Sequence, residues 1–459
     1  MKIPLTASQD IKKDLSQRDI RLLERALRVL EQNQYDEVSR FFDGRTMICP
    51  GFRGIWNWDS AFHAIGVSRF DKQLAIDQIE GFFKYILEDG MLPDLIGKDG
   101  IPEIHSSKPP VFAWATYEVY KNTGDIDFLR RMYDKLEQNE SFWRTNRFDG
   151  KLFHYGAYLS GSEQDVLTWG KWESGWDNSI RWDDGIFEYY PVDLNCFMFS
   201  FYECMGKIAA LIGKPNDEWI SKAAELAALI EQTFWNEKMG AYTDYNRVTG
   251  RHSSALTPAS FMPLFIKTAS PERAERMAEI AMDKNKFNGI MPTASYDSTD
   301  FSNDYWRGPM WLNTAYFAAK GLSNYHPAVA DTVKENILRL VDDIDDAIYL
   351  CPKLGRIDFM LKRLMTSAST VLNSYQQRNS MRPYRRWHHR VLRIDMEQMI
   401  SRFVLKFLSL SRTIRIRYSF LVLVYCFGLE LHLFSQCLQL TVRLSLSNFS
   451  RRNNALMNL

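Results

Sequence analysis

The sequence predicts an all-α fold for residues 1–348, and three observations support this prediction. Apolar residues recur at helical spacing through most of this stretch; Leu23, Leu27 and Leu30, for example, fall on one side of a helix. Helix-capping residues stand at the expected ends of such segments. Helical and strand-like segments do not alternate and no glycine-rich phosphate loop occurs, which argues against a nucleotide-binding α/β fold.

The individual elements follow from the same signals. The helical pattern is clearest in the segments 18–34, 72–87, 128–143, 193–212, 218–234 and 330–341. Ser270 before Pro271 predicts another helix start, and Gly124 and Gly213 stand where helices should end. Only residues 240–245 have a convincing strand pattern. Because no Pro-, Gly- or Ser-rich linker divides this part, we expect residues 1–348 to form one continuous domain.

Composition places the chain among ordinary globular proteins. Of its 459 residues 46% are hydrophobic and 25% are charged. The six cysteines are scattered without a CxxC motif, which favours free thiols in a reducing compartment. The first residues contain no apolar leader segment, so we expect a cytoplasmic protein. No cluster of cysteine and histidine has metal-ligand spacing, so we expect neither a metal nor a cofactor.

Residues 349–459 differ sharply from the rest. They contain 18 Lys and Arg against 4 Asp and Glu, whereas residues 1–348 contain 39 against 52. Leu, Arg and Ser, the amino acids with six codons each, supply 47 of the 111 tail residues. Because translation in a wrong frame enriches these three, we interpret the segment as an anomalous basic tail produced by a frameshift near residues 349–352.

Two other interpretations of the tail were weighed. A basic arm could bind nucleic acid, but such arms rarely alternate with long apolar runs. The segment 419–440 is apolar enough to suggest a membrane span, but it contains Glu430, His432 and Gln436. We therefore expect neither a nucleic-acid partner nor a membrane anchor.

Three tracts that combine tryptophan with carboxylate or amide residues indicate a carbohydrate site. Their members are Trp56, Trp58 and Asp59 in the first; Trp172, Trp176, Asp177 and Asn178 in the second; Tyr305, Trp306, Arg307 and Trp311 in the third. Aromatic faces stack on sugar rings, and carboxylate, amide and guanidinium groups bind hydroxyls. The competing interpretation is that the tryptophans are core residues and the aspartates are helix caps.

Asp177 is the strongest catalytic candidate. Neighbouring indoles lower the local dielectric constant and raise the pKa of a carboxyl group, as a general acid requires near neutral pH. Asn178 is expected to fix the loop or a substrate hydroxyl. Glu173 is too close in sequence to lie reliably across a sugar from Asp177, and we expect it to be a solvated loop residue.

The motifs carrying these residues resemble those of (α/α)6-barrel glycoside hydrolases. Trp58-Asp59-Ser60, Pro109-Pro110, the stretch Ser174 to Ser179, Pro191 to Asn195 and Tyr305 to Pro309 occur in the order found in that group. The nearest branch is similar to the mannosylglycerate and glucosylglycerate hydrolases, relatives of processing α-glucosidase I and of trehalases. The resemblance covers about residues 55–348 and implies an (α/α)6 toroid that is incomplete at its C-terminal end.

The resemblance also implies a chemistry. It implies an inverting glycosidase that acts on an α-linked glucosyl or mannosyl compound, with Asp177 as the general acid. The glutamate that activates water precedes a P-x-T-G segment in the family, and Leu350 stands about where this base should be. Activity of this chain is therefore expected to be impaired.

The remaining site residues are expected to bind substrate. The tracts around Trp58 and Trp306 would form two sides of a sugar subsite, with Trp58 only partly buried. Arg307 would pair with a substrate carboxylate such as glycerate or with Asp304. His63 and His105 are interpreted as helix-surface or hydroxyl-binding residues.

Other functions remain open at this point. Trehalase or oligosaccharide α-glucosidase specificity and a dead, sugar-binding pseudoenzyme are alternatives. Sugar epimerases with similar barrels use histidine pairs, which the eight histidines and the Trp-Asp-Asn-Ser tract do not favour.

Overall fold

The computed structural model describes residues 2–49, 54–158, 161–342 and 349–350. All of them belong to one structural unit, Met1–Lys353. The predicted tail therefore lies outside the described residues, except for positions 349 and 350.

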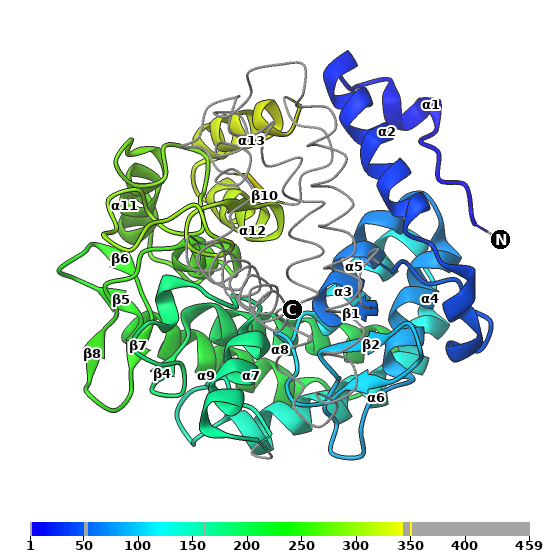
Figure 1. The fold of residues 1–459 in the computed structure, drawn as a ribbon, viewed down its shortest axis with the longest axis horizontal. Coiled ribbons are helices and arrows are strands. Elements are labelled where there is room, and N and C mark those ends of the chain that lie inside the picture. The colour runs from blue at the N-terminus through cyan, green and yellow to red at the C-terminus, as the bar shows by residue number, and fades with distance from the viewer. Residues whose placement is uncertain (1, 50–53, 159–160, 343–348, 351–459) are drawn as a thin grey trace, which may run out of the picture. The chain divides into compact units, whose positions relative to one another are not determined.

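Helices in this unit alternate between an inner and an outer layer (Figure 1). The inner helices are α3 (Asn57–Val67), α5 (Phe112–Thr123), α8 (Val192–Ile212), the short α10 (Met262–Phe265) and α12 (Leu312–Ser323). The outer helices are α4 (Lys72–Phe83), α6 (Ile126–Arg147), α9 (Asp217–Thr233), α11 (Pro271–Met282) and α13 (Pro327–Asp342). Each inner helix contacts the next one, and α3, α5, α8 and α12 each pack against the outer helix that follows. This arrangement is that of an α/α toroid.

The position of a helix in these layers follows from its apolar pattern. The inner helix α8 buries most of its residues, including Phe197, Phe201 and Met205, and exposes a stripe only in its C-terminal half, at Glu203, Lys207 and Leu211. It ends at Gly213, whose φ of 76° is in the left-handed region that glycine adopts readily. The outer helices bury only one face.

The N-terminal segment packs against the last described outer helix. It contains α1 (Gln9–Lys12) and α2 (Gln17–Gln32), and α2 contacts α13. Arg18 forms an ion pair with Glu335 at 2.6 Å, and the Arg25 guanidinium donates to the main-chain oxygen of Val341. These contacts join the two ends of the described helical series.

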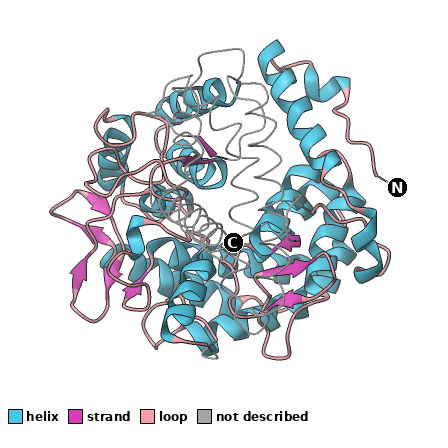
Figure 2. Ribbon diagram, viewed as in Figure 1, coloured by secondary structure: helices cyan, strands magenta, loops and turns pink. Residues whose placement is uncertain are grey.

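Strands are few and short (Figure 2). One antiparallel sheet contains β1 (Gly54–Trp56), β2 (Leu95–Gly97) and β3 (Pro102–Glu103), and a second contains β4 (Tyr189–Tyr190), β7 (Tyr245–Asn246) and β8 (Arg251–His252). Two antiparallel pairs are formed by β5 (Trp235–Asn236) with β6 (Ala241–Tyr242) and by β9 (Met310–Trp311) with β10 (Tyr349–Leu350). Short 3₁₀ turns cover Asp36–Phe41, Ile180–Trp182 and Pro258–Phe261.

The all-α prediction is confirmed. All six expected helices are present within a few residues, and Gly124, Gly213 and Ser270 cap helices as predicted. For α5 the sequence predicted the two ends, at Pro109-Pro110 and Gly124, but it missed α1, α3, α7 (Glu163–Ser174), α10 and α12. The expected strand 240–245 is split between β6 and β7. In the part that the structure describes, no helix is long and apolar enough to cross a membrane.

Candidate active site

Three buried tryptophans bring the three sequence tracts together. Trp58 lies in the first turn of α3, Trp176 follows α7, and Trp306 precedes β9. The Trp306 ring centroid lies 6.4 Å from that of Trp58 and 5.2 Å from that of Trp176. None of the three is more than 5% exposed. The expectation that Trp58 is only partly buried is therefore wrong, because the other two tracts cover it.

The tryptophans that keep part of their surface exposed are different ones. Trp56, Trp172 and Trp311 are each partly exposed. Trp311 stacks on Trp306 with ring centroids 4.0 Å apart and an interplanar angle of 10°, and its indole N–H donates to the main-chain oxygen of Tyr305. These outer rings are the ones available to a ligand, while the inner three form their support.

Gly175 permits the close approach of the first two tracts. It ends α7 with a φ of 73°, a conformation that costs other residues energy. A Cβ atom at this position would lie 2.5 Å from the Trp58 ring. Only glycine satisfies both requirements, which explains its place between Ser174 and Trp176.

The carboxyl group of Asp177 lies in a partly buried setting beside Tyr305. The Tyr305 hydroxyl donates to Asp177 Oδ2 at 3.0 Å. Burial raises the pKa of Asp177, while the ammonium group of Lys108 and the Tyr305 hydrogen bond lower it. Tyr305 itself has a φ of 38°, a strained backbone conformation that tends to occur at functional sites. The result is a carboxyl group that resists ionisation but has a donor ready for its ionised form.

Asp59 is a second carboxyl group in the same region. It lies in the first turn of α3, directly after Trp58. Burial raises its pKa to about 6, Lys108 opposes this shift, and the charge of Asp177 adds to it. Asp59 and Asp177 therefore act on each other electrostatically, although they are 118 positions apart in the chain.

Asn178 joins the second tract to the third. Its side-chain amide donates to Asp304 Oδ2 at 2.7 Å, and its side-chain oxygen accepts from the main-chain N–H of Trp306 at 2.8 Å. Both ends of the amide are thus used by protein groups. This geometry gives Asn178 a role in fixing the loop.

Arg307 has a different partner from the one expected. Its guanidinium binds both carboxylate oxygens of Asp183, at 2.7 Å each, and donates to the main-chain oxygen of Asn178. The expected ion pair with Asp304 is wrong, because Asp304 is engaged by Asn178 and Asp183 presents both oxygens to the planar guanidinium.

Glu173 is not a solvated loop residue, and that expectation is wrong. Its side chain is fully buried and forms an ion pair with Arg147 at 2.7 Å. It also accepts hydrogen bonds from the main-chain N–H groups of Ser107 and Gly156. Arg147 is 26 positions away, so the sequence around Glu173 alone could not show this partner.

Sequence reasoning also missed a buried pair, Lys108 and Asp94, next to the site. The Lys108 ammonium lies 3.0 Å from Asp94 Oδ1, and both side chains are at most 5% exposed. Lys108 stands before Pro109, which supplied a signal for the start of α5 but none for burial of the preceding lysine. Asp94 lies just before β2, a strand too short to be recognised.

The two histidines near the tracts have separate surroundings. His63 lies on α3, one turn after Asp59, and burial lowers its pKa to about 4. His105 is exposed and stacks on Trp169 at 4.2 Å. Among the described residues, no group of three or more Asp, Glu, His or Cys side chains could hold a metal ion.

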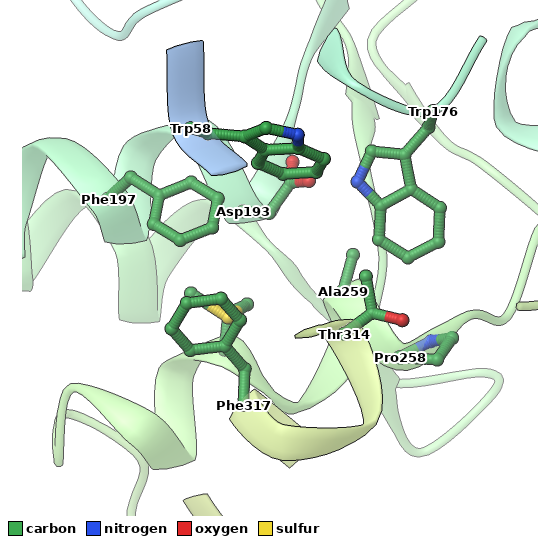
Figure 3. A pocket seen from close by; sticks show the side chains of 9 residues that line it. Trp58, Trp176, Asp193, Phe197, Pro258, Ala259, Thr314 and Phe317 are labelled. Atoms are coloured by element: carbon green, nitrogen blue, oxygen red, sulfur yellow. The ribbon is translucent and has the colours of Figure 1, made fainter. Parts of the chain in front are cut away.

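A small cavity lies behind the buried tryptophans (Figure 3). Figure 3 shows the rings of Trp58 and Trp176 at its upper side and Phe317 at its lower side. Its one charged lining residue, Asp193, is held by Arg181 at 2.6 Å. This carboxylate is therefore already paired, and the other walls of the cavity are mainly apolar.

The position expected for the water-activating base lies beside the third tract. Leu350 is in β10, whose backbone pairs with β9 in the register Leu350 to Met310 and Tyr349 to Trp311. The backbone at position 350 is therefore opposite Met310, one residue before Trp311. A leucine at this position has no group that can accept a proton.

A helical toroid that gathers carboxyl groups among indole and phenol rings has the architecture of a glycoside hydrolase. The chain belongs to the mannosylglycerate hydrolase MGH1-like glycoside hydrolase family, whose model matches residues 53–351. The predicted resemblance is thereby confirmed.

Individual relatives are distant in sequence. The mannosylglycerate hydrolase of Rubrobacter radiotolerans is 22% identical over 388 residues, which cover 65% of this chain and 86% of the relative. The GH63 mannosylglycerate hydrolase of Thermus thermophilus, solved with Tris and D-glycerate, superposes with a TM-score of 0.63 at 21% identity, over 73% of this chain and 96% of the other. Neutral trehalase of Saccharomyces cerevisiae superposes with a TM-score of 0.55 at 18% identity, over 65% of each chain.

Proposed function

We propose that this chain carries the acid half of an inverting glycosidase site for a small α-linked glucoside or mannoside, such as a glycosylglycerate. The observation that carries the proposal is the environment of Asp177: a partly buried carboxyl group that accepts a hydrogen bond from Tyr305, whose ring contacts those of Trp306 and Trp311. The relatives support the substrate class, since those from Rubrobacter radiotolerans and Thermus thermophilus are mannosylglycerate hydrolases.

In this proposal Asp177 protonates the glycosidic oxygen as the bond to the anomeric carbon breaks. Burial keeps the carboxyl group protonated beforehand, and Tyr305 then donates to the carboxylate that remains. Inverting enzymes place a second carboxylate about 6.5–9.5 Å away, with the attacking water on the opposite face of the sugar. Leu350 stands where that base is expected, so we propose that hydrolysis by this chain is impaired.

The substrate-binding residues are proposed from the exposure of their side chains and from their chemistry. Asp59 is the hydroxyl-binding carboxylate, and the partly exposed rings of Trp56, Trp172 and Trp311 are stacking surfaces. Arg307 would have to exchange Asp183 for a glycerate carboxylate, so we assign Arg307 to loop stability. The buried free thiols of Cys196 and Cys204 support the proposed cytoplasmic location.

The proposal is tested by returning a base to position 350. We expect Leu350→Glu to hydrolyse mannosylglycerate, glucosylglycerate or trehalose faster than the parent chain, and Leu350→Gln, which has similar shape and no base, to show no gain. Adding Asp177→Asn to Leu350→Glu should lower the rate of hydrolysis of these glycosides by about 10²-fold or more, which removes the gain. Hydrolysis of a glycosyl fluoride should be spared, because fluoride needs little protonation to leave.

Two results would contradict the proposal. Equal losses on glycoside and fluoride would remove Asp177 from the role of general acid. A parent chain that hydrolyses any of the three glycosides robustly would show that a base lies elsewhere. If sugars bind but neither the parent chain nor Leu350→Glu hydrolyses them, the protein is a sugar-binding pseudoenzyme.

A further inference from the structure

Lys108 is a buried cation that pairs with Asp94 and is acted on by the charges of Asp59 and Asp177. It lies just before α5, and its side chain is 5% exposed. Its ammonium group is 3.0 Å from Asp94 Oδ1 and 5.9 Å from the centroid of the Trp56 ring, and it donates to the main-chain oxygen of Trp172. A buried ammonium group is costly unless such partners surround it, so its position needs an explanation.

We propose that Lys108 is a positioning residue of the candidate site, which anchors the last turn of α7 and supplies the positive charge that balances Asp59 and Asp177. This inference deepens the proposed function, because it assigns a tuning group to the proposed acid.

The anchoring part follows from the contact with Trp172. That residue lies in the last turn of α7, where its main-chain oxygen accepts the N–H of the cap residue Gly175 and takes the Lys108 ammonium as a second donor. A cation at this end also interacts favourably with the helix dipole. Because Asp177 follows α7 by only three residues, a contact that fixes the helix end also fixes the carboxyl group.

The balancing part follows from the groups that face the ammonium. These are Asp94 before β2, Asp59 on α3 and Asp177 after α7, with Glu103 on β3 acting on Asp94. Burial lowers the pKa of Lys108, but the three carboxylates, Asp94 first, raise it by more, so the ammonium stays charged. In return Lys108 lowers the pKa of Asp59, Asp94 and Asp177 against the effect of burial.

This balance has a consequence for an acid. A carboxyl group that is too desolvated holds its proton too tightly to give it away. An adjacent cation stabilises the carboxylate formed when the proton leaves, and so makes the buried acid strong enough to act. Lys108 would supply this effect without touching the substrate.

The experiment is a pH titration of tryptophan fluorescence, which needs no turnover. A neutral carboxyl group quenches a nearby indole more than a carboxylate does, so ionisation of Asp177 should change the emission of its tryptophan neighbours. The part of the signal that disappears in Asp177→Asn defines the Asp177 midpoint. We compare this midpoint in the full-length parent, Lys108→Met, Lys108→Arg and Asp94→Asn, with circular dichroism to confirm folding.

We expect Lys108→Met to raise the Asp177 midpoint by about one pH unit or more, because the balancing charge is gone. Lys108→Arg should stay close to the parent. Asp94→Asn should lower the midpoint, because it keeps the cation and removes a carboxylate that shares it. Should Lys108→Met not fold, Asp94→Asn decides the question.

An Asp177 midpoint that is unchanged in folded Lys108→Met, or in folded Asp94→Asn when the lysine variant fails to fold, would overturn the proposal. A lower melting temperature with an unchanged midpoint would show that Lys108 is merely structural. If the parent shows no Asp177-dependent signal at all, the proposed acid fails and not the role of Lys108 alone.

Discussion

A single glycine determines how closely the first two tracts can approach. Gly175 combines a φ of 73° with a contact that leaves no room for a Cβ atom beside Trp58. Gly124 provides a comparison, since it has a φ of 72° and nothing within 4 Å of the Cβ that a substitution would add. The two positions therefore separate backbone strain from steric conflict.

We expect Gly124→Ala to lower the free energy of unfolding by about 1–2 kcal/mol, from the left-handed backbone alone. Gly175→Ala should cost about 1–3 kcal/mol more, because the buried Trp58 ring must shift. Urea denaturation of both variants against the parent measures the difference. Equal costs would show that the Trp58 ring yields freely.

The shifted pKa of Asp59 predicts a dependence of stability on pH. Burial raises this pKa from 3.8 to about 6, so the native state holds the proton more tightly than the unfolded state does. The stabilisation is complete below about pH 4 and is lost as the pH rises to about 6.

The parent should therefore lose up to about 3 kcal/mol relative to Asp59→Asn between pH 4 and pH 6. Urea denaturation at several pH values in this range measures the effect, with the exposed Asp331→Asn as control. Parallel pH curves for the parent and Asp59→Asn would contradict the shift.

At the scale of elements, the helix α7, which Asp177 follows by three residues, is held by contacts that are remote in sequence. Its start has a capping box, in which Ser162 and Asp165 exchange hydrogen bonds, and this pattern in the sequence was a usable but overlooked signal. Its end is held by Glu173 and Arg147, and no local pattern predicts that pair. The longest helices, α6, α8 and α9, were predictable because their periodicity extends over many residues, whereas α3 and α12 have only 11 and 12 residues, of which half or more are buried.

The candidate site was predictable to a similar extent. The three tracts could be found because tryptophan beside aspartate is chemically distinctive, and the structure brings their rings together. Their internal arrangement was not predictable, since burial of Trp58 and the pairing of Arg307 with Asp183 depend on side chains from other tracts.

We expect removal of the Glu173 charge to destabilise the protein. Glu173→Gln leaves the Arg147 guanidinium, which is 8% exposed, without its counter-ion, and breaking a buried pair in this way costs about 3–5 kcal/mol. Thermal and urea denaturation measure the loss, and the exposed Glu88→Gln serves as the matched control. A loss no larger than that of the control would mean that water replaces the pair.

At the scale of the whole molecule, the charge imbalance between residues 1–348 and 349–459 is the main unexplained property of the chain. The family model matches up to residue 351, close to the point where the composition changes. Both observations support the interpretation of the tail as an out-of-frame product. Resequencing the gene across codons 345–355 tests it directly: a single-base shift that restores a glutamate before a P-x-T-G segment is the expected result.

The same interpretation predicts how the chain behaves as a protein. A sequence that was not selected to fold with the toroid should be cut faster than the domain that precedes it, because cleavage requires an accessible, unfolded backbone. Limited trypsin digestion should therefore cut first in the arginine-rich stretch 382–393, which offers Arg385, Arg386, Arg390 and Arg393; Arg382 precedes Pro383 and should stay uncut. A fragment ending near residue 350 should persist, although residues 1–348 contain 39 Lys and Arg of their own. Mass spectrometry of the first fragments identifies the cut sites. Cleavage spread evenly over the chain, or a resistant tail, would show that residues 349–459 are a folded part of the native protein.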